Sequence, residues 1–368
     1  MSQEGSKYAQ SGVDYSAMDP IKVLAQKRAA QTAGNLAAFN AHEVTDSRGE
    51  SAYVWDEGDS YRSLVVEGLG TKNLVADAMR QYGDKTYYDA IAQDTIAMVV
   101  NDLIVVGALP QVVNAYFAIG DSNWMRDEKR VADLINGWAD ACDLAGATWG
   151  GGETPTLKGI INPETIDLGG SAVGIIQNKD NLVLGEKLAA GDKIILVASS
   201  GIHANGLTLA RKVGDEAAEG YVTKLIDGRT YGEALLTPTP IYVPIVRALQ
   251  QANIDIHYMV NITGHGWRKL MRSTKDFNYV IDEVPEVPAE FHFIQDQTNS
   301  SDNDMYGNFN MGAGYAVYVG EADAEKVVTS INEQGFKAII AGTVQDGPKQ
   351  VTITPMNITF SGDTLEVR

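Results

Sequence analysis

A long, mostly apolar stretch, residues 96–119, sets the strongest limit on how this chain can fold. Residues 89–106 have the length of a helix with an almost wholly apolar surface, and residues 111–119 follow as an apolar strand. An element that is apolar all round is buried between other elements. A membrane span is disfavoured, because Asp102 lies in the stretch and Pro110 interrupts it. The sequence therefore predicts a core helix followed by a buried strand.

Composition narrows the class of protein further. The chain has 368 residues, with 48 Asp and Glu against 29 Lys and Arg, and its net charge is −19. Such an acidic surface repels phosphate backbones, which argues against nucleic acid or an anionic membrane as the main partner. With 44% apolar and 21% charged residues, the chain has the composition of a folded protein. The single cysteine, Cys142, fits a reducing compartment, and we expect a soluble, cytoplasmic protein without a signal peptide.

The chain divides into two halves at a polar, turn-rich stretch, residues 177–192. We place the boundary between residues 180 and 181. Residues 1–18 are predicted to be a flexible N-terminal segment, followed by a helix with Asp19 as its cap and Pro20 in its first turn. Both halves alternate apolar strands with helices, which predicts two domains of mixed α and β structure with antiparallel pairing in at least one. The domains then cover residues 19–180 and 181–368.

A glycine turn follows the strand predicted before Gly68. The strand ends in the carboxylate of Glu67, and the turn contains Gly68, Gly70, Thr71 and Lys72. A turn of this kind exposes backbone N–H groups to phosphate oxygens, with Lys72 as a point charge and Thr71 as a hydroxyl ligand. The spacing is not that of a P-loop, so a plain tight turn is the alternative interpretation.

Three polar residues interrupt the predicted core helix. At 100° per residue, Asp94 and Asn101 lie within about 20° of each other, and Asp102 lies about 80° from Asp94. Carboxylates on an otherwise apolar helix are costly to bury unless they are paired or bind a metal ion. A salt bridge to Lys or Arg is one interpretation, and a metal or nucleotide site is the other.

A further carboxylate, Glu153, follows the glycines Gly151 and Gly152 at the end of a short strand. A carboxylate on so flexible a backbone is suited to bind a hard cation such as Mg²⁺. The alternative interpretation is a turn with a solvated Glu153. Together the carboxylates and Lys72 form the set expected around a magnesium–triphosphate complex. The predicted metal ligands are Glu67, Asp94, Asp102 and Glu153.

The second half contains a loop of small residues before a helix, residues 199–206. Hydroxyls and exposed N–H groups at a helix N-terminus make an anion site. His203 lies among them, placed for proton transfer or for gripping a phosphate, with an ordinary loop histidine as the alternative. The predicted substrate-binding residues are Ser199, Ser200, Gly201, His203 and Asn205.

These motifs, in this order, resemble the phosphoribosylformylglycinamidine cyclo-ligase family, also called aminoimidazole ribonucleotide synthetase. The resemblance covers most of the chain. The matching segments are SGVDYSAMD (11–19), EGLGTK (67–72), DTIAMVVNDLIVVGALP (94–110), GGET (151–154), SSGIHANGLTLARKV (199–213), LTPTPIYV (236–243), NITGHGW (261–267) and FNMGAGY (309–315).

The resemblance implies a fold, a reaction and a set of roles. It implies an N-terminal α/β domain that binds ATP and dimerises through its strands, and a C-terminal α+β domain. The reaction would use ATP to phosphorylate the amide oxygen of formylglycinamidine ribonucleotide, after which a nitrogen attacks, the ring closes and phosphate leaves. The implied cofactors are ATP and Mg²⁺. The implied catalytic residues are Asp102, His203 and Lys72, and the implied nucleotide contacts are Gly68, Gly70, Thr71, Lys72, Asn101, Gly151 and Gly152.

Three departures from the family pattern keep other activities open. Glu67 stands where the family usually has Asp, and His265 interrupts a loop that is normally all glycine. Residues 36–43 lack the glycine-rich segment that closes over ATP phosphates in the family. A kinase or synthetase of the same superfamily acting on another substrate is one alternative function. A non-catalytic nucleotide-binding homologue is the other.

Overall fold

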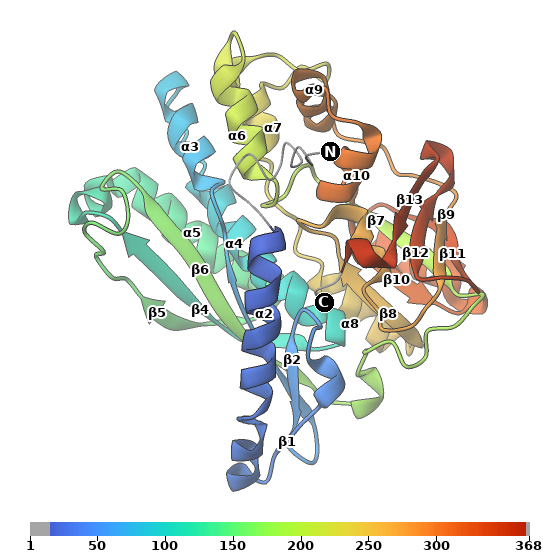
Figure 1. Cartoon of the computed structure of the whole chain (residues 1–368). Helices are drawn as coiled ribbons and strands as arrows, with labels where there is room; N and C mark the ends of the chain where they lie inside the picture. Colours follow the sequence, from blue (N-terminus) through green and yellow to red (C-terminus); the bar gives the residue numbers. More distant parts are fainter. Residues whose placement is uncertain (1–14, 366–368) are drawn as a thin grey trace.

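The computed structural model describes the backbone of residues 15–365 and the side chains of residues 21–365. Within this range the chain forms two sheets, one from each half of the sequence, with helices packed against them (Figure 1). Both halves mix helices and strands, which confirms the predicted two-domain architecture of α/β and α+β type. The boundary predicted between residues 180 and 181 lies in the link between the two sheets.

The described part of the N-terminal half contains a six-stranded sheet in the order β1-β2-β3-β6-β4-β5. Neighbouring strands are antiparallel except β4 and β5, which run parallel. The strands are β1 (His42–Glu43), β2 (Tyr53–Asp56), β3 (Tyr61–Gly68), β4 (Leu109–Ile119), β5 (Thr148–Glu153) and β6 (Ile166–Ile176).

Helix α4 (Tyr88–Leu103) packs against β3, β6 and the amphipathic helix α5 (Glu128–Ala145), so the two helices cover one face of this sheet. The predicted core helix is therefore confirmed, and a 3-10 turn extends it to Val106. No helix in residues 15–365 combines the length and apolarity needed to cross a membrane. The described residues of this half also form α2 (Tyr15–Ala30) and α3 (Asn73–Met79).

The opposite face of the N-terminal sheet carries exposed apolar side chains. Alternate residues of β3 and β4 point to this face because successive side chains of a strand point to opposite sides. They are Leu64, Val66, Val112 and Tyr116. Val66 is 75% exposed, so no described element covers the centre of this face.

The described part of the C-terminal half contains a seven-stranded sheet in the order β13-β12-β9-β11-β7-β10-β8, antiparallel except for the pair β9 and β12. Its strands are β7 (Lys193–Ala198), β8 (Ile256–Asn261), β9 (Asn278–Ile281), β10 (Ala313–Val319), β11 (Ala338–Gln345), β12 (Gln350–Ile353) and β13 (Ile358–Ser361). Its helices are α6 (Leu207–Glu216), α7 (Tyr231–Leu235), α8 (Val243–Gln251), α9 (Ala289–Thr298), α10 (Asp302–Asn308) and α11 (Ala324–Glu333).

Two predicted helix starts are wrong. Helix α2 begins at Tyr15, so the flexible segment predicted to end at residue 18 is too long by its last four residues. The good helix formers Ala17 and Met18 favour this earlier start. Residues 1–14 lie outside the described residues. The proline after Thr239 predicts a helix start there, but helix α8 begins only at Val243, because Asp94 and Asn101 accept hydrogen bonds from the N–H groups of Thr239 and Tyr242 and hold this segment extended.

Candidate active site

The polar residues of α4 are satisfied by groups from α3 and from the C-terminal half. Asp94 and Lys72, both fully buried, form an ion pair with 2.8 Å between Nζ and Oδ2. The backbone N–H of Thr239 donates to Asp94 across 2.8 Å, and Lys72 also donates to the carbonyl of Thr237 across 2.9 Å. Burial raises the pKa of Asp94, and the Lys72 ammonium opposes that shift. Of the two interpretations of Asp94, the salt bridge therefore holds in this conformation. The Lys72 ammonium is buried in the pair and is not exposed for binding phosphate.

Asn101, which follows Asp94 on α4, binds the same segment of the C-terminal half, the one before α8. Its amide nitrogen donates to the carbonyl of Pro240 across 2.8 Å, and its oxygen accepts from the N–H of Tyr242 across 2.9 Å. Both ends of the side chain amide are thus used to fix the extended segment before α8. The geometry gives Asn101 a structural role, and its implied contact to the nucleotide stays a prediction.

Two of the three remaining predicted carboxylates, Glu67 and Asp102, meet in one cavity. The cavity has a volume of about 690 Å³ and lies between the N-terminal sheet, α2 and the C-terminal half. Asp102 is 7% exposed and accepts a hydrogen bond of 2.7 Å from the amide of Asn261, at the end of β8. Burial, and then the charge of Asp102, raises the pKa of Glu67 to about 7. This cavity unites two of the four predicted metal ligands.

Basic side chains face these carboxylates from the C-terminal half. Lys269 and Arg272 line the cavity from the turn after β8, and His265 lies beside them. Burial lowers the pKa of Lys269 to about 8, against the opposing charge of Asp102. Burial and the neighbouring Lys269 lower the pKa of His265 to about 3, so this imidazole is neutral at pH 7. Lys269 and Arg272 were not predicted from the sequence. Two basic residues three positions apart after a glycine loop are nevertheless a visible signal in so acidic a chain.

Helix α2 closes the cavity from the N-terminal side, where Lys22, Ala25 and Gln26 line it. The C-terminal end of the described residues reaches the cavity as well. Leu365, at that end of the described chain, lines the same cavity. Helix α2 therefore covers the predicted site, in the place that the family pattern gives to a glycine-rich segment.

The loop from Ser199 to Gly206 lies next to the Lys72–Asp94 pair, since Ser200 Oγ donates to the carbonyl of Pro238 across 2.8 Å. His203 is buried, has a left-handed backbone with a φ of 60°, and accepts from the N–H of Ser200 across 3.3 Å. Burial, and then the charge of Lys72, lowers the pKa of His203 to about 3. Asn205 donates to Sδ of Met98 on α4 across 3.7 Å. The predicted substrate loop is thus assembled, with a neutral histidine inside it.

Glu153, Gly151 and Gly152 lie apart from both groups, exposed at the edge strand β5. Glu67 is on β3 and two strands intervene, so at the usual strand spacing Glu153 is about 14 Å from Glu67. A Cβ at Gly152 would overlap the carbonyl of Ala115, so this glycine is needed for the close approach of β5 to β4. Within residues 21–365 no group of three or more His, Cys, Asp or Glu side chains could hold a metal ion. The predicted four-carboxylate set is therefore not assembled in this chain alone.

The glycine turn after Glu67 has the expected open backbone. Gly68 and Gly70 are exposed, Gly70 has a φ of 77°, and Thr71 is half-buried. Gly68 and Glu67 also border a cavity of about 430 Å³ on the uncovered face of the sheet. Their implied contacts to the nucleotide stay predictions.

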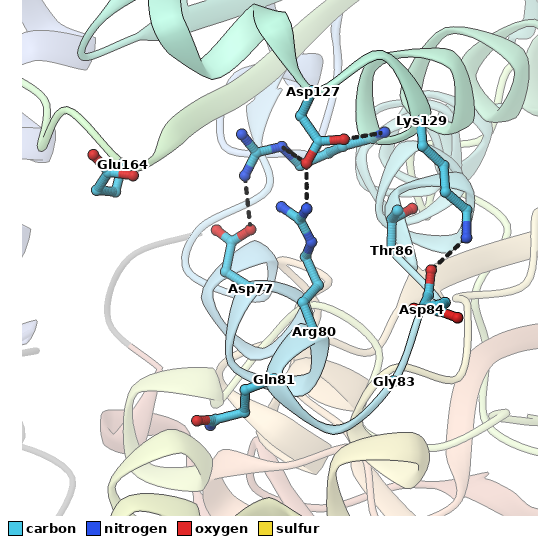
Figure 2. Close-up of a pocket in the computed structure, with 10 residues that line it drawn as sticks. Asp77, Arg80, Gln81, Gly83, Asp84, Thr86, Asp127, Lys129 and Glu164 are labelled. Atoms are coloured by element: carbon cyan, nitrogen blue, oxygen red, sulfur yellow. Dashed lines mark hydrogen bonds and ion pairs between the residues drawn. The ribbon is translucent and has the colours of Figure 1, made fainter.

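Another cavity, of about 720 Å³, lies between α3 and the start of α5 and contains none of the predicted residues (Figure 2). Its basic side chains are already engaged: Arg130 pairs with Asp77 across 3.4 Å, Arg80 pairs with Asp127, and Lys129 donates to a backbone carbonyl. The charges that line this cavity therefore neutralise one another. We take the cavity at Glu67 and Asp102 as the candidate active site.

The chain matches two family descriptions that together span most of its length. Residues 49–176 match the N-terminal domain of the AIR synthase related proteins, and residues 189–354 match their C-terminal domain. The fold and site thus define a two-domain protein of the AIR synthase related class. Within that class, the chain belongs to the phosphoribosylformylglycinamidine cyclo-ligase family, as its curated relatives show.

One such relative, from Methanococcus maripaludis strain C6, is 36% identical over 341 residues, which cover 92% of each chain. Another, from Methanobrevibacter smithii, is 35% identical over 360 residues, covering 97% of this chain and 98% of the relative. Both are named phosphoribosylformylglycinamidine cyclo-ligase. The family resemblance in the sequence motifs is confirmed.

Solved structures share the fold at low sequence identity. The HypE–HypF complex contains a chain with a TM-score of 0.60 and 18% identity, covering 85% of this chain and 92% of that one. Thiamine-monophosphate kinase from Stenotrophomonas maltophilia K279a has a TM-score of 0.58 and 15% identity, covering 82% and 88%. These similarities confirm the two-domain fold.

Proposed function

We propose that the protein is an ATP-dependent cyclo-ligase that converts formylglycinamidine ribonucleotide to aminoimidazole ribonucleotide. The observation that carries the proposal is the 36% identity to a cyclo-ligase over 92% of both chains. The meeting of Glu67, Asp102 and Lys269 in one cavity between the two halves supports it, because a phosphate-transfer site needs carboxylates for a metal and a cation for phosphate.

The proposed reaction has two bond exchanges. The amide oxygen of the substrate forms a bond to the γ-phosphorus of ATP, and ADP leaves with the electrons of the broken bond. A nitrogen of the substrate then attacks the activated carbon, the ring closes and the carbon–oxygen bond breaks to release phosphate. Positioning of the two substrates and stabilisation of phosphate charge are the contributions such a site makes.

Glu67 and Asp102 fit a magnesium ion. Two neighbouring carboxylates, one with a pKa raised to about 7 by burial and by the other's charge, are stabilised by a divalent cation. Magnesium is commonly held by one or two carboxylates together with substrate phosphates, so no third side chain is required. When bound, magnesium would neutralise charge on the phosphate oxygens. Asp94 and Glu153 remain proposed ligands only if the Lys72–Asp94 pair opens and β5 moves closer.

The loop from Ser199 to Gly206 is the proposed binding element for the ribonucleotide, through Ser199, Ser200, Gly201, His203 and Asn205. Because the pKa of His203 is lowered to about 3, the ring is neutral at pH 7. Its proposed role is therefore hydrogen bonding to substrate rather than charge attraction. The turn at Gly68, Gly70 and Thr71 is the proposed contact for the nucleotide.

A homodimer and a cytoplasmic location belong to the same proposal. The uncovered apolar face at Leu64, Val66, Val112 and Tyr116 supports dimerisation through the N-terminal sheet, since patches of this kind mark interaction surfaces. The single cysteine fits a reducing compartment.

The decisive experiment measures phosphate release from Mg-ATP by the purified protein, with and without formylglycinamidine ribonucleotide, and identifies the nucleotide product by mass spectrometry. We expect phosphate release only with the ribonucleotide, and one aminoimidazole ribonucleotide formed per ADP. Hydrolysis that is indifferent to the ribonucleotide would point to another substrate. ATP that binds and is never hydrolysed would indicate a non-catalytic homologue.

A further inference from the structure

Lys269 is a buried cation to which the described side chains give no hydrogen bond or ion pair. It lies in the turn Gly266–Met271 after β8 and is 9% exposed. Within residues 21–365 its ammonium group makes no hydrogen bond and no ion pair with a side chain or a backbone carbonyl, and it borders the cavity at Glu67 and Asp102. A mostly buried ammonium whose only neighbour besides protein is the cavity itself favours an anion bound in that cavity, because Coulomb attraction is stronger in such a partly desolvated place than in bulk water.

Other polar and charged groups around the cavity have partners of their own. The ion pair of Arg272 with Glu50 has a nitrogen–oxygen distance of 3.8 Å, and the hydroxyl of Tyr258 donates to Glu50 across 2.9 Å. Asp102 is held by Asn261. Neither Glu67 nor Asp102 comes within 4.0 Å of the Lys269 ammonium, so all three charges line one cavity without forming an ion pair across it.

This arrangement matches the chemistry of a phosphate bound together with a metal ion. Carboxylates bind the metal, the metal binds phosphate oxygens on one side, and a cation binds the remaining oxygens on the other. Lysine suits that last position, because its ammonium is a compact charge with three hydrogen-bond donors. A cavity of about 690 Å³ has room for such a group.

We propose that Lys269 binds the phosphoryl group that ATP transfers, in the cavity that it shares with Glu67 and Asp102. The inference rests on the proposed function and deepens it, because it names a catalytic residue that touches the transferred group. Lys269 stays protonated throughout and donates hydrogen bonds to the phosphoryl oxygens, first in ATP and then in the phosphorylated amide. It neither gains nor loses a proton in either bond exchange.

The test compares nucleotides that differ in their phosphates. Affinities of the full-length protein and of Lys269→Met for ATP, ADP and AMP are measured by calorimetry in the presence of magnesium. We expect Lys269→Met to weaken ATP binding by about ten-fold or more, the effect of losing a hydrogen bond to a charged group, and to leave AMP binding unchanged. Lys269→Arg, which keeps the charge, is expected to recover part of the affinity for ATP.

Lys326→Met on the exposed face of α11 is the matched control, since it removes a lysine far from the cavity. Thermal unfolding checks that each variant folds, and Lys269→Gln replaces Lys269→Met if the latter does not. Unchanged ATP affinity, equal losses for ATP and AMP, or an effect only on the KM of the ribonucleotide would each overturn the role of Lys269. A native protein that binds ATP but does not convert formylglycinamidine ribonucleotide would contradict the proposed function alone, because the nucleotide series still tests Lys269.

Discussion

At the scale of single residues, the site is defined by which carboxylates are satisfied inside the protein and which are left for a ligand. Asp94 is fully engaged by Lys72 and Thr239, whereas Glu67 and Asp102 share a cavity with each other. The difference follows from position on α4, because Asp94 faces α3 and Asp102 faces the end of β8. Burial alone therefore does not mark a catalytic carboxylate in this protein.

Asp102→Asn is expected to abolish turnover while the fold stays intact. The amide keeps the size of the side chain, and its oxygen can still accept from Asn261, but the charge that would face magnesium is lost. We expect kcat to fall by about a hundred-fold or more. Turnover and thermal unfolding are measured side by side, with Asp143→Asn on the exposed face of α5 as the control. Surviving activity in Asp102→Asn would refute the role of Asp102.

The raised pKa of Glu67 predicts that the stability of the protein depends on pH. Its pKa in the folded protein is raised to about 7 from an ordinary 4.5, so between these values the folded state binds more protons than the unfolded state. Stability without magnesium should therefore fall as the pH rises from about 5 to 7, by about 2 kcal/mol once partial exposure is allowed for. Denaturant unfolding across this range measures the loss. Glu67→Gln should flatten the profile, and an equal slope in both proteins would contradict the assignment to Glu67.

At the scale of elements, the long apolar and amphipathic patterns were predictable from the sequence. Residues 89–106 and 111–119 correspond to α4 and β4, because burial on all sides leaves a continuous apolar signal. The two-residue strand β1 was not predicted, since it is too short to show a period. The extended segment before α8 was expected to be helical, but Asp94 and Asn101 hold its backbone N–H groups, which are contacts between residues about 140 positions apart.

The candidate site was predictable to a similar degree. The glycine turn and strand end at Glu67 carry a local signal, and so does a carboxylate such as Asp102 in an apolar helix. The pairing of Lys72 with Asp94 left two interpretations open, because spacing along the chain does not tell which face each side chain occupies. The basic residues after the glycine loop are a local signal, but that Lys269 faces the cavity depends on how the two halves pack, which the sequence does not show.

Lys72→Met tests whether the buried pair serves structure or phosphate binding. Removing the ammonium leaves Asp94 charged in the core that joins α3, α4 and the segment at Thr237. Breaking a buried pair in this way costs about 3–5 kcal/mol, so we expect a loss of this size in denaturant unfolding. The double variant Lys72→Met with Asp94→Leu should regain much of it. If Lys72→Met instead keeps full stability and loses ATP affinity, Lys72 contacts phosphate and the pair opens when the nucleotide binds.

At the scale of the whole molecule, the two sheets differ in how completely their apolar side chains are covered. The C-terminal sheet buries all seven residues of its strand β10, while the N-terminal sheet exposes apolar residues across one face. Helices α4 and α5 cover only the other face of that sheet. The activity proposed for the cavity and the dimer proposed for the open face therefore both depend on β3, which carries Leu64 and Val66 of the open face as well as Glu67 of the cavity.

The open face predicts a dimer that a charge should disrupt. Leu64→Lys combined with Val112→Lys places two ammonium groups at the centre of the apolar patch, where a second copy would have to remove them from water. Light scattering should then give the chain mass of 39.6 kDa for the variant and twice that mass for the native protein. Ile226→Lys is the matched control, because Ile226 is 95% exposed and lies in the C-terminal half, away from this face. A native protein of single-chain mass, or a double variant that remains dimeric, would contradict dimerisation through the N-terminal sheet.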